Sequence, residues 1–381
     1  MDFLVFSDDF GEHPSSCQHL FRHIAQQHRV LWVNTIGMRA PRPTIKDARK
    51  ALRKIGKMVG WDHLALPSEH MPSALTVVQP GMLPYANLHL VRRLNSHSVI
   101  RTVRHKLHSL EMHDPIFVTT VPNACDYIGA FGEQRVVYYC VDDFAHWPGH
   151  TAEYISALET ALLDRCDICI ATSKALYDRF KQGRYASHLL THGVDVRHFA
   201  ALPEREHPAL KHIPSPRVGY CGLIDERLDQ GLVAAIARAL PHTAFVFTGS
   251  VVTNVRELER LDNVYFTGPV PYTELPAMMA GWVVCMLPYK LDTLAQSINP
   301  LKLKEYIATG KPVLSTPLPA AQELEAHLDL GKDAAAWSGL LRERLFAPHS
   351  TGRRREVGGW LWNEGWGEKA QTFLSFVARA A

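Results

Sequence analysis

The strongest chemical signal in the sequence is a polar loop that leads into an amphipathic segment, residues 297–316. It reads Ser-Ile-Asn-Pro-Leu-Lys-Leu-Lys-Glu-Tyr-Ile-Ala-Thr-Gly-Lys-Pro-Val-Leu-Ser-Thr. Asn299 and Pro300 are residue types that begin helices, so we expect Asn299 to cap a helix that starts at Leu301. The free backbone N–H groups and the dipole at that end attract phosphate, and Lys302 adds a positive charge. The segment therefore predicts a diphosphate site.

A carboxylate follows this positive helix end. Glu305 lies one to two turns into the expected helix 301–308, on a face able to meet a pair of ribose hydroxyls. An ionised carboxylate accepts two such hydrogen bonds well. The alternative is an ordinary amphipathic helix whose Lys and Glu side chains face water.

A second segment, residues 219–229, also contains groups suited to phosphate. It reads Gly-Tyr-Cys-Gly-Leu-Ile-Asp-Glu-Arg-Leu-Asp. Gly222 would let a ligand approach the backbone closely, and the guanidinium of Arg227 suits bidentate contact with phosphate oxygens. The alternative for Arg227 is a surface ion pair with Glu226 or Asp229. We favour the phosphate role, because two distant segments then predict the same ligand.

Acidic and histidine side chains follow two buried apolar runs in the first half of the chain. These candidates for a second ligand site, the acceptor site if the protein transfers a group, are Asp8, Asp9, His13, Asp142, Asp143 and His146. The carboxyl ends of parallel strands face the ligand crevice of an open sheet. Two acids there are costly unless solvated or paired, so we favour a binding or catalytic role for Asp142 and Asp143. The alternative is that one of them caps the next helix.

The elements that must position these groups are short apolar runs alternating with helix-like segments. Continuous rather than alternating apolar runs are typical of parallel strands covered by helices on both faces. The expected strands are 3–7, 30–34, 75–78, 116–120, 136–141, 168–172 and 188–192, then 218–221, 244–248, 264–267, 283–287 and 312–315. Residues 201–216, rich in Pro, His and charge, separate the two series and are expected to be a linker. The pattern predicts an α/β protein with a doubly wound domain at 1–200 and another at 217–355.

Composition narrows the class of protein. The chain has 381 residues, of which 46% are hydrophobic and 21% charged, a balance typical of globular proteins. A net charge of +3 gives no reason to expect nucleic acid. The N-terminus lacks the charged and apolar regions of a signal peptide, and no apolar run is long enough to span a bilayer. We expect a cytoplasmic protein.

No metal site is expected. Cys166 and Cys169 have the spacing of a redox or zinc motif, but no second pair follows at zinc spacing. The seven cysteines are better explained as buried thiols. No histidines show a metal-binding spacing, and no Asp-x-Asp pair indicates a metal-dependent transferase.

Residues Arg39–Lys57 form a distinct basic segment, with eight Lys or Arg side chains and one acid. Apolar residues recur there at helical spacing, so a basic amphipathic helix is expected. Such helices lie on anionic membrane surfaces. The equally supported alternative is a solvated helix docked on the core.

The loop and helix at 297–316 resemble the donor-site motif of the group 1 (family 4) glycosyltransferases, in the variant seen in polysaccharide-assembly members. That motif has two glutamates eight positions apart. Glu305 matches the second, which binds the nucleotide ribose in the family. The first, which contacts the donor sugar, would fall at Ser297, so this chain departs from the pattern. Residues 264–276 resemble the segment that holds the base, near Val270.

The resemblance implies a GT-B fold, in which two Rossmann-like domains face each other across a cleft and a C-terminal helix, within 356–381, returns to the first. It implies no cofactor, only a nucleotide-sugar donor, UDP- or GDP-linked, and a glycan or lipid-linked acceptor. The implied donor-binding residues are Gly222, Arg227, Val270, Ser297, Asn299, Leu301, Lys302 and Glu305. Of these, Arg227 and Lys302 would stabilise the departing diphosphate.

The expected function is transfer of a sugar in the biosynthesis of a cell-surface polysaccharide or glycoconjugate. Membrane contact through Arg39–Lys57 would place the enzyme peripherally on the inner face of the membrane. Two alternatives stay open: a nucleotide-sugar epimerase on the same fold, and a non-catalytic transferase relative that serves as an assembly partner, which Ser297 suggests.

Overall fold

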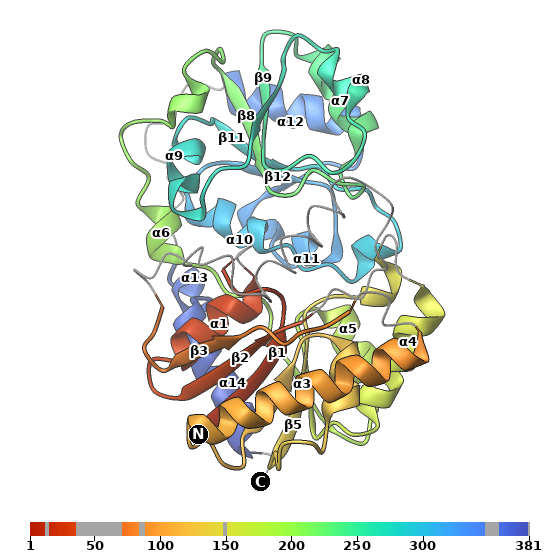
Figure 1. The fold of residues 1–381 in the computed structure, drawn as a ribbon. Coiled ribbons are helices and arrows are strands. Elements are labelled where there is room, and N and C mark those ends of the chain that lie inside the picture. The colour runs from red at the N-terminus through yellow and green to blue at the C-terminus, as the bar shows by residue number, and fades with distance from the viewer. Residues whose placement is uncertain (12–14, 36–70, 84–87, 148–150, 347–357, 380–381) are drawn as a thin grey trace. The chain divides into compact units, whose positions relative to one another are not determined.

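The computed structural model describes residues 1–11, 15–35, 71–83, 88–147, 151–346 and 358–379. The chain divides into two compact units (Figure 1). Unit 1 comprises residues 1–191 and 369–381, and unit 2 comprises residues 192–368. The basic segment 39–57 and His13 lie outside the described residues.

Unit 1 is built on a parallel sheet, which has seven strands within the described residues, in the order β3-β2-β1-β4-β5-β6-β7. The strands are β1 (Asp2–Ser7), β2 (Arg29–Asn34), β3 (Leu75–Val78), β4 (Ile116–Thr119), β5 (Arg135–Cys140), β6 (Ile168–Ala171) and β7 (Ala186–Leu189). The helices are α1 (Ser16–Ile24), α3 (His89–Ser109), η2 (Pro122–Tyr127), η3 (Phe144–His146), α4 (Ala152–Leu163), α5 (Lys174–Phe180) and the greater part of α14 (Trp366–Arg379).

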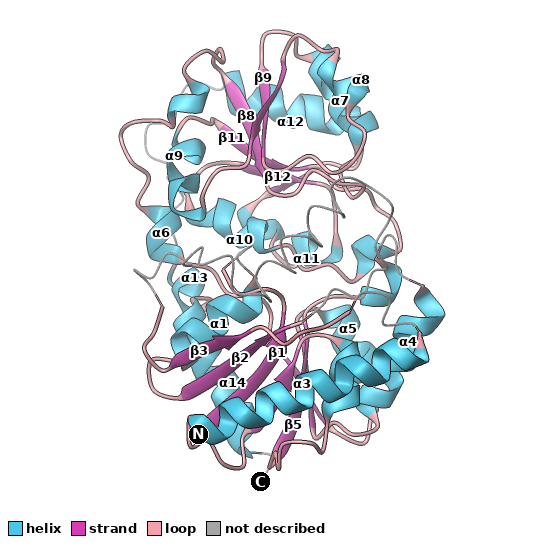
Figure 2. Ribbon diagram, in the orientation of Figure 1, coloured by secondary structure: helices cyan, strands magenta, loops and turns pink. Residues whose placement is uncertain are grey.

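Helices cover both faces of this sheet (Figure 2). Leu4 and Phe6 of β1 belong to one buried cluster with Val103 of α3. On the opposite face, the ring of Phe21 in α1 packs edge-on against Phe3 and against Phe373 of α14. Because side chains alternate along a strand, both faces of β1 must be apolar, which explains its continuous hydrophobic run.

Unit 2 repeats the architecture. In the part of the chain that the structure describes, its parallel sheet has six strands in the order β10-β9-β8-β11-β12-β13. The strands are β8 (Arg217–Cys221), β9 (Ala244–Thr248), β10 (Val264–Gly268), β11 (Val284–Leu287), β12 (Val313–Ser315) and β13 (Asp329–Leu330). The helices are α6 (Val196–Ala200), η4 (Pro208–Leu210), α7 (Gln230–Ala239), α8 (Arg256–Glu259), η5 (Tyr272–Glu274), α9 (Leu275–Ala280), η6 (Leu294–Gln296), α10 (Leu301–Ala308), α11 (Pro319–Gln322), η7 (Glu325–His327), α12 (Ala334–Phe346) and α13 (Gly359–Asn363).

The predicted α/β class with two doubly wound parallel sheets is confirmed. One expected strand, 188–192, was placed wrongly: the strand is Ala186–Leu189. It is an edge strand whose residues are only partly buried, so it lacks the continuous apolar run that marked the others. Residues 201–216, expected to be a linker, lie within unit 2. There Leu210 is fully buried and the backbone N–H of His207 donates to the carbonyl of Ala277 at 3.0 Å.

Candidate functional site

The candidate donor site of unit 2 lies at the point in its sheet where the order of the strands reverses. The chain runs from β8 outward through β9 to β10, then returns to β11 on the other side of β8. Open α/β sheets bind ligands beyond the carboxyl ends of the strands at such a switch point. The loop that leaves β8 begins at Gly222, and the loop that leaves β11 contains Tyr289.

Two glycines let the backbone loops meet at this edge. Gly222 has φ +135° and Gly249, just after β9, has φ +143°. A Cβ atom on Gly222 would lie 2.0 Å from Cε of Lys302, and one on Gly249 would lie 1.9 Å from the carbonyl oxygen of Gly222. The positive φ disfavours any side chain at both positions, and at Gly249 a side chain would also collide with the backbone of Gly222. Sequence reasoning identified Gly222 and missed Gly249, whose contact partner is distant in sequence.

Helix α10 points its N-terminal residues at the same edge, because it is fixed to β8. The backbone N–H of Cys221, the last residue of β8, donates to the hydroxyl of Tyr306 at 2.9 Å. The helix begins at Leu301 with Pro300 in the N-cap position, and no side chain caps it. The prediction that Asn299 is the cap was therefore wrong. Pro300 takes that position because its extended backbone (φ −70°, ψ 119°) suits an N-cap residue.

Lys302 brings its charge to the backbone of Gly222. Its ammonium lies 5.8 Å from the centre of the Tyr220 ring. Among the described residues, Lys302 has no hydrogen bond to a side chain and no ion pair. A cation held against a glycine backbone beside a helix N-terminus is suited to bind an anion.

Glu305 is a partly buried carboxylate that has no hydrogen-bond or ion-pair partner within the described parts of the chain. The pKa of Glu305 is raised to about 7: burial raises it most, the charge of Lys302 opposes the shift, and the charge of Asp195 adds to it. A carboxylate without a partner is unfavourable in the empty protein. A ligand that offers two hydroxyl groups would supply the missing donors.

Arg227 is held by Asp225, not by Glu226 or Asp229. The two side chains form a bidentate ion pair with a shortest distance of 2.6 Å. Asp229 instead caps α7, accepting from the N–H of Leu232 at 2.9 Å. The guanidinium of Arg227, which we expect to contact phosphate, is therefore already oriented by the carboxylate of Asp225.

The charges of Lys302 and Arg227 both influence Tyr289. The guanidinium of Arg227 lies 5.5 Å from the centre of the Tyr289 ring. Burial by itself would raise the pKa of Tyr289, but the charges of Lys302 and Arg227 outweigh burial and hold that pKa below its ordinary value. Its hydroxyl lies 3.4 Å from that of Tyr220. Neither tyrosine was identified from the sequence, because each sits in or next to an apolar strand.

Ser297 and Val270 are the remaining donor-side candidates. Ser297 is buried, and its hydroxyl donates to the carbonyl of Leu294 at 3.0 Å, which ends η6. Val270 follows β10 and packs partly on the core of unit 2. The serine therefore fills a small buried position with its own hydrogen bond satisfied.

A buried ion pair fixes α10 on its other side. The ammonium of Lys304 donates to the carbonyl of His192 at 2.6 Å and pairs with the carboxylate of Glu364. Lys304 is buried, although lysines seldom are. The pair holds the helix next to the residue that begins unit 2.

In unit 1, Asp8 organises the loop that follows β1. Its carboxylate accepts from the side chains of Ser7 at 2.8 Å, Ser15 at 3.1 Å and Gln18 at 2.9 Å. Burial raises its pKa, and these hydrogen bonds oppose the shift. Asp9 follows it, and its carbonyl accepts from Gln18 at 3.3 Å.

Asp143, after β5, is neutralised by a cation that the sequence did not reveal. Arg179 lies 3.2 Å from its carboxylate and 3.1 Å from that of Glu159. Exposed His146 lies 2.9 Å from Asp143 on the other side. Asp143 does not cap η3 through its side chain. Asp142 lies beside it, and its carboxylate accepts from the N–H of Asp143 at 3.0 Å.

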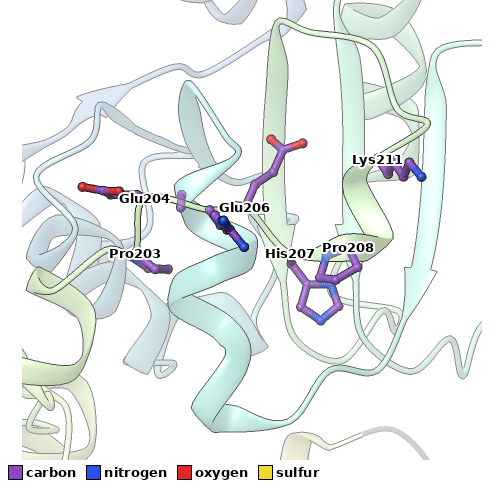
Figure 3. A pocket seen from close by; sticks show the side chains of 8 residues that line it. Pro203, Glu204, Glu206, His207, Pro208 and Lys211 are labelled. Atoms are coloured by element: carbon purple, nitrogen blue, oxygen red, sulfur yellow. The ribbon is translucent and has the colours of Figure 1, made fainter.

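A surface hollow of about 590 Å³ lies elsewhere on unit 2, lined by 203–208, Lys211 and Ala280 (Figure 3). No donor-site candidate lines it. Its Glu206 pairs with Arg217 at 2.5 Å and its His207 with Glu274 at 2.8 Å. These charged groups hold the segment in place and give no sign of a ligand.

The described residues offer neither a metal site nor a membrane span. No group of three or more His, Cys, Asp or Glu side chains in them is arranged to hold a metal. The cysteines are free thiols, and all but Cys166 are buried. None of the helices described here is long and apolar enough to cross a membrane.

Comparison with known proteins shows a family resemblance in unit 2. Residues 215–337 match the family model described as glycosyl transferases group 1. The putative teichuronic acid biosynthesis glycosyltransferase TuaH of Bacillus subtilis (strain 168) is 31% identical over 182 residues, which are 45% of this chain and 45% of TuaH. The chain thus spans about half the length of this curated relative.

Solved structures share the whole fold. HepE of Anabaena, in complex with UDP-glucose, is 16% identical with a TM-score of 0.68 over 100% of both chains. Sucrose-phosphate synthase from Thermosynechococcus elongatus is 15% identical with a TM-score of 0.69 over 99% of this chain and 98% of its own. At these identities the matches show a GT-B fold. The chain therefore resembles the group 1 glycosyltransferases in unit 2 and shares the GT-B fold over its whole length.

Proposed function

We propose that this protein transfers a sugar from a nucleoside diphosphate sugar to a glycan or lipid-linked acceptor, in the biosynthesis of a cell-surface polysaccharide or glycoconjugate. The match of unit 2 to the family and the similarity to TuaH support the reaction class and the setting. The complexes of HepE with UDP and with UDP-glucose support a nucleotide sugar as donor.

One observation carries the proposal. The N-terminus of α10, the ammonium of Lys302 and the bare backbone of Gly222 converge at the switch point, with Glu305 behind them, and among the described residues neither Lys302 nor Glu305 has an ion pair. The diphosphate would bind the helix N–H groups from Leu301 onward together with Lys302. The ribose hydroxyls would donate to Glu305.

The remaining donor-side residues take supporting roles in this proposal. The backbone near Val270 would contact the base, and Ser297 and Asn299 would lie toward the sugar. As the bond between the sugar and the diphosphate breaks, negative charge grows on the leaving phosphate. Lys302 and Arg227 would stabilise that charge, so no metal or cofactor is required.

The acceptor would bind unit 1, near Asp8, Asp9, His13 and His146. Its attacking hydroxyl must lose a proton as the new glycosidic bond forms. Asp142 and Asp143 are the proposed catalytic carboxylates there, and one of them would accept this proton. Because Asp143 is neutralised by Arg179, Asp142 is the better candidate for the base. We place the enzyme in the cytoplasm, peripheral to the membrane through residues 39–57.

Release of nucleoside diphosphate from UDP- and GDP-sugars by the purified protein tests the proposal. Glu305→Ala, Lys302→Ala and Arg227→Ala should each lose release while circular dichroism shows a folded protein. Lys332→Ala, at an exposed position of unit 2, is the matched control and should retain it. Unchanged release in all three variants would refute the donor site.

Two alternatives make different predictions. An epimerase converts the nucleotide sugar without any acceptor, so chromatography of the sugar after incubation alone identifies it. A non-catalytic relative, suggested by Ser297 in place of the family glutamate, would form no product from any donor. Absence of nucleotide binding by calorimetry would favour that reading.

A further inference from the structure

Helix α3 carries an unusual set of charges. Its 21 residues contain no Asp or Glu. The basic residues are Arg92, Arg93, Arg101, Arg104 and Lys106, with histidines at 89, 97, 105 and 108. A helix on the surface of a soluble domain ordinarily mixes both signs of charge.

Three arginines, Arg93, Arg101 and Arg104, lie on the exposed face of the helix, whereas Arg92 and Lys106 are only partly exposed. Asn95, Val99, Val103 and Leu107 pack inward on unit 1. The exposed residues recur at helical spacing along the outer face: Leu90, Arg93, Leu94, His97, Arg101, Arg104, His105 and His108. Figure 1 shows α3 as a long helix on the outside of unit 1.

Leucines gather at the N-terminal end of the same face. Leu88, Leu90 and Leu94 are 55%, 70% and 52% exposed. Leu83, 51% exposed, lies next to them, because its backbone N–H and carbonyl both bond to the side chain of Asn95, at 2.7 and 2.8 Å. A group of exposed leucines of this kind marks an interaction surface.

Few of the cations are neutralised. Arg92 pairs with Asp126 at 2.5 Å, and Arg104 donates to the carbonyl of Ala130 at 2.8 Å. Within the described residues, the exposed side chains of Arg93 and Arg101 have no ion pair or side-chain hydrogen bond. Their charge is available to a partner.

We propose that the outer face of α3 docks unit 1 on an anionic lipid bilayer. The leucines at one end would enter the boundary between headgroups and acyl chains, and the arginines along the helix would meet lipid phosphates. A soluble polyanion would use the arginines but would gain nothing from the exposed leucines. The proposal concerns binding alone, so it does not depend on sugar transfer or on residues 39–57.

Co-sedimentation with vesicles of equal parts phosphatidylglycerol and phosphatidylcholine tests it, with pure phosphatidylcholine vesicles as the reference. Removal of two charges in Arg93→Gln/Arg101→Gln should weaken binding roughly thirtyfold, the equivalent of about 1 kcal/mol for each arginine. Leu90→Ser/Leu94→Ser should weaken binding more than tenfold. The control Arg256→Gln/Arg260→Gln removes the same charge from exposed positions of unit 2 and should bind like the wild type.

The variants change exposed side chains, so thermal unfolding should match that of the wild type. Equal binding of the α3 variants and the wild type would overturn the proposal. It would also fail if the leucine variant binds vesicles normally while duplex DNA or polyphosphate binds the protein in an arginine-dependent way. That result would make the face a site for soluble polyanions.

Discussion

Glu305→Gln should make the empty protein more stable while it weakens nucleotide binding. The pKa of the Glu305 carboxyl is raised from 4.5 to about 7 in the folded protein, mainly by burial. Below pH 4.5 the carboxyl is protonated in both the folded and the unfolded protein, so it does not lower the free energy of unfolding. As pH rises from 4.5 to 7, only the unfolded chain ionises freely, so stability is lost, and above pH 7 the whole cost is present.

The size of the effect follows from the pKa difference. A shift from 4.5 to about 7 corresponds to about 3 kcal/mol, and partial exposure of Glu305 reduces this to about 2 kcal/mol. Glutamine has nearly the same shape and never ionises. The variant should therefore gain about 2 kcal/mol over the wild type at pH 8 and close to nothing at pH 4.5.

Urea unfolding at both pH values, followed by circular dichroism, measures this difference. Glu323→Gln, at an exposed position of unit 2, is the control and should change stability by less than about 0.5 kcal/mol. The same Glu305 variant should bind a nucleoside diphosphate roughly tenfold to a hundredfold more weakly, because a charge-assisted hydrogen-bond pair is lost. A variant that is no more stable than the wild type at pH 8 would refute the reasoning.

Three further predictions concern the same helix and loop. Wild-type affinity for a nucleoside diphosphate should rise between pH 6 and pH 8, as Glu305 ionises, and calorimetry should show less of this rise in the Gln variant. Gly222→Ala should cost roughly 1–3 kcal/mol in thermal unfolding, because its φ of +135° disfavours a side chain, and should weaken nucleotide binding, because its Cβ would displace the side chain of Lys302. Gly339→Ala, with open space around it, should be harmless. Lys304→Met should destabilise unit 2 by roughly 3–5 kcal/mol, because it breaks the ion pair with Glu364. Adding Glu364→Gln should recover part of this loss in urea unfolding, and equal stability of the single and double variants would contradict a coupled pair.

Local patterns revealed most of the fold. Strands such as Leu75–Val78 and Ala244–Thr248 were predicted at their observed bounds, because each is a continuous apolar run between polar segments. Helix α3 was not among the expected elements. Its buried stripe is only one residue per turn, and its many charges and histidines obscure the helical period.

The candidate site was only partly predictable. Lys302 and Glu305 were identified because a helix start and a charge pattern are local signals. Gly249 was missed because its need for glycine comes from the carbonyl of Gly222, which is distant in sequence. Arg179 was missed for the same reason: only the fold brings it to Asp143. Asn299 was misassigned because the sequence could not show which of two adjacent helix-starting residues takes the cap.

Calorimetric titration of UDP and GDP into the wild type, Lys302→Ala and the control Lys332→Ala tests the central claim most directly. The account predicts that at least one nucleotide binds the wild type and the control equally, and binds Lys302→Ala roughly tenfold to a hundredfold more weakly. Equal affinity in all three proteins, or no binding to any of them, would contradict a diphosphate site at the start of α10.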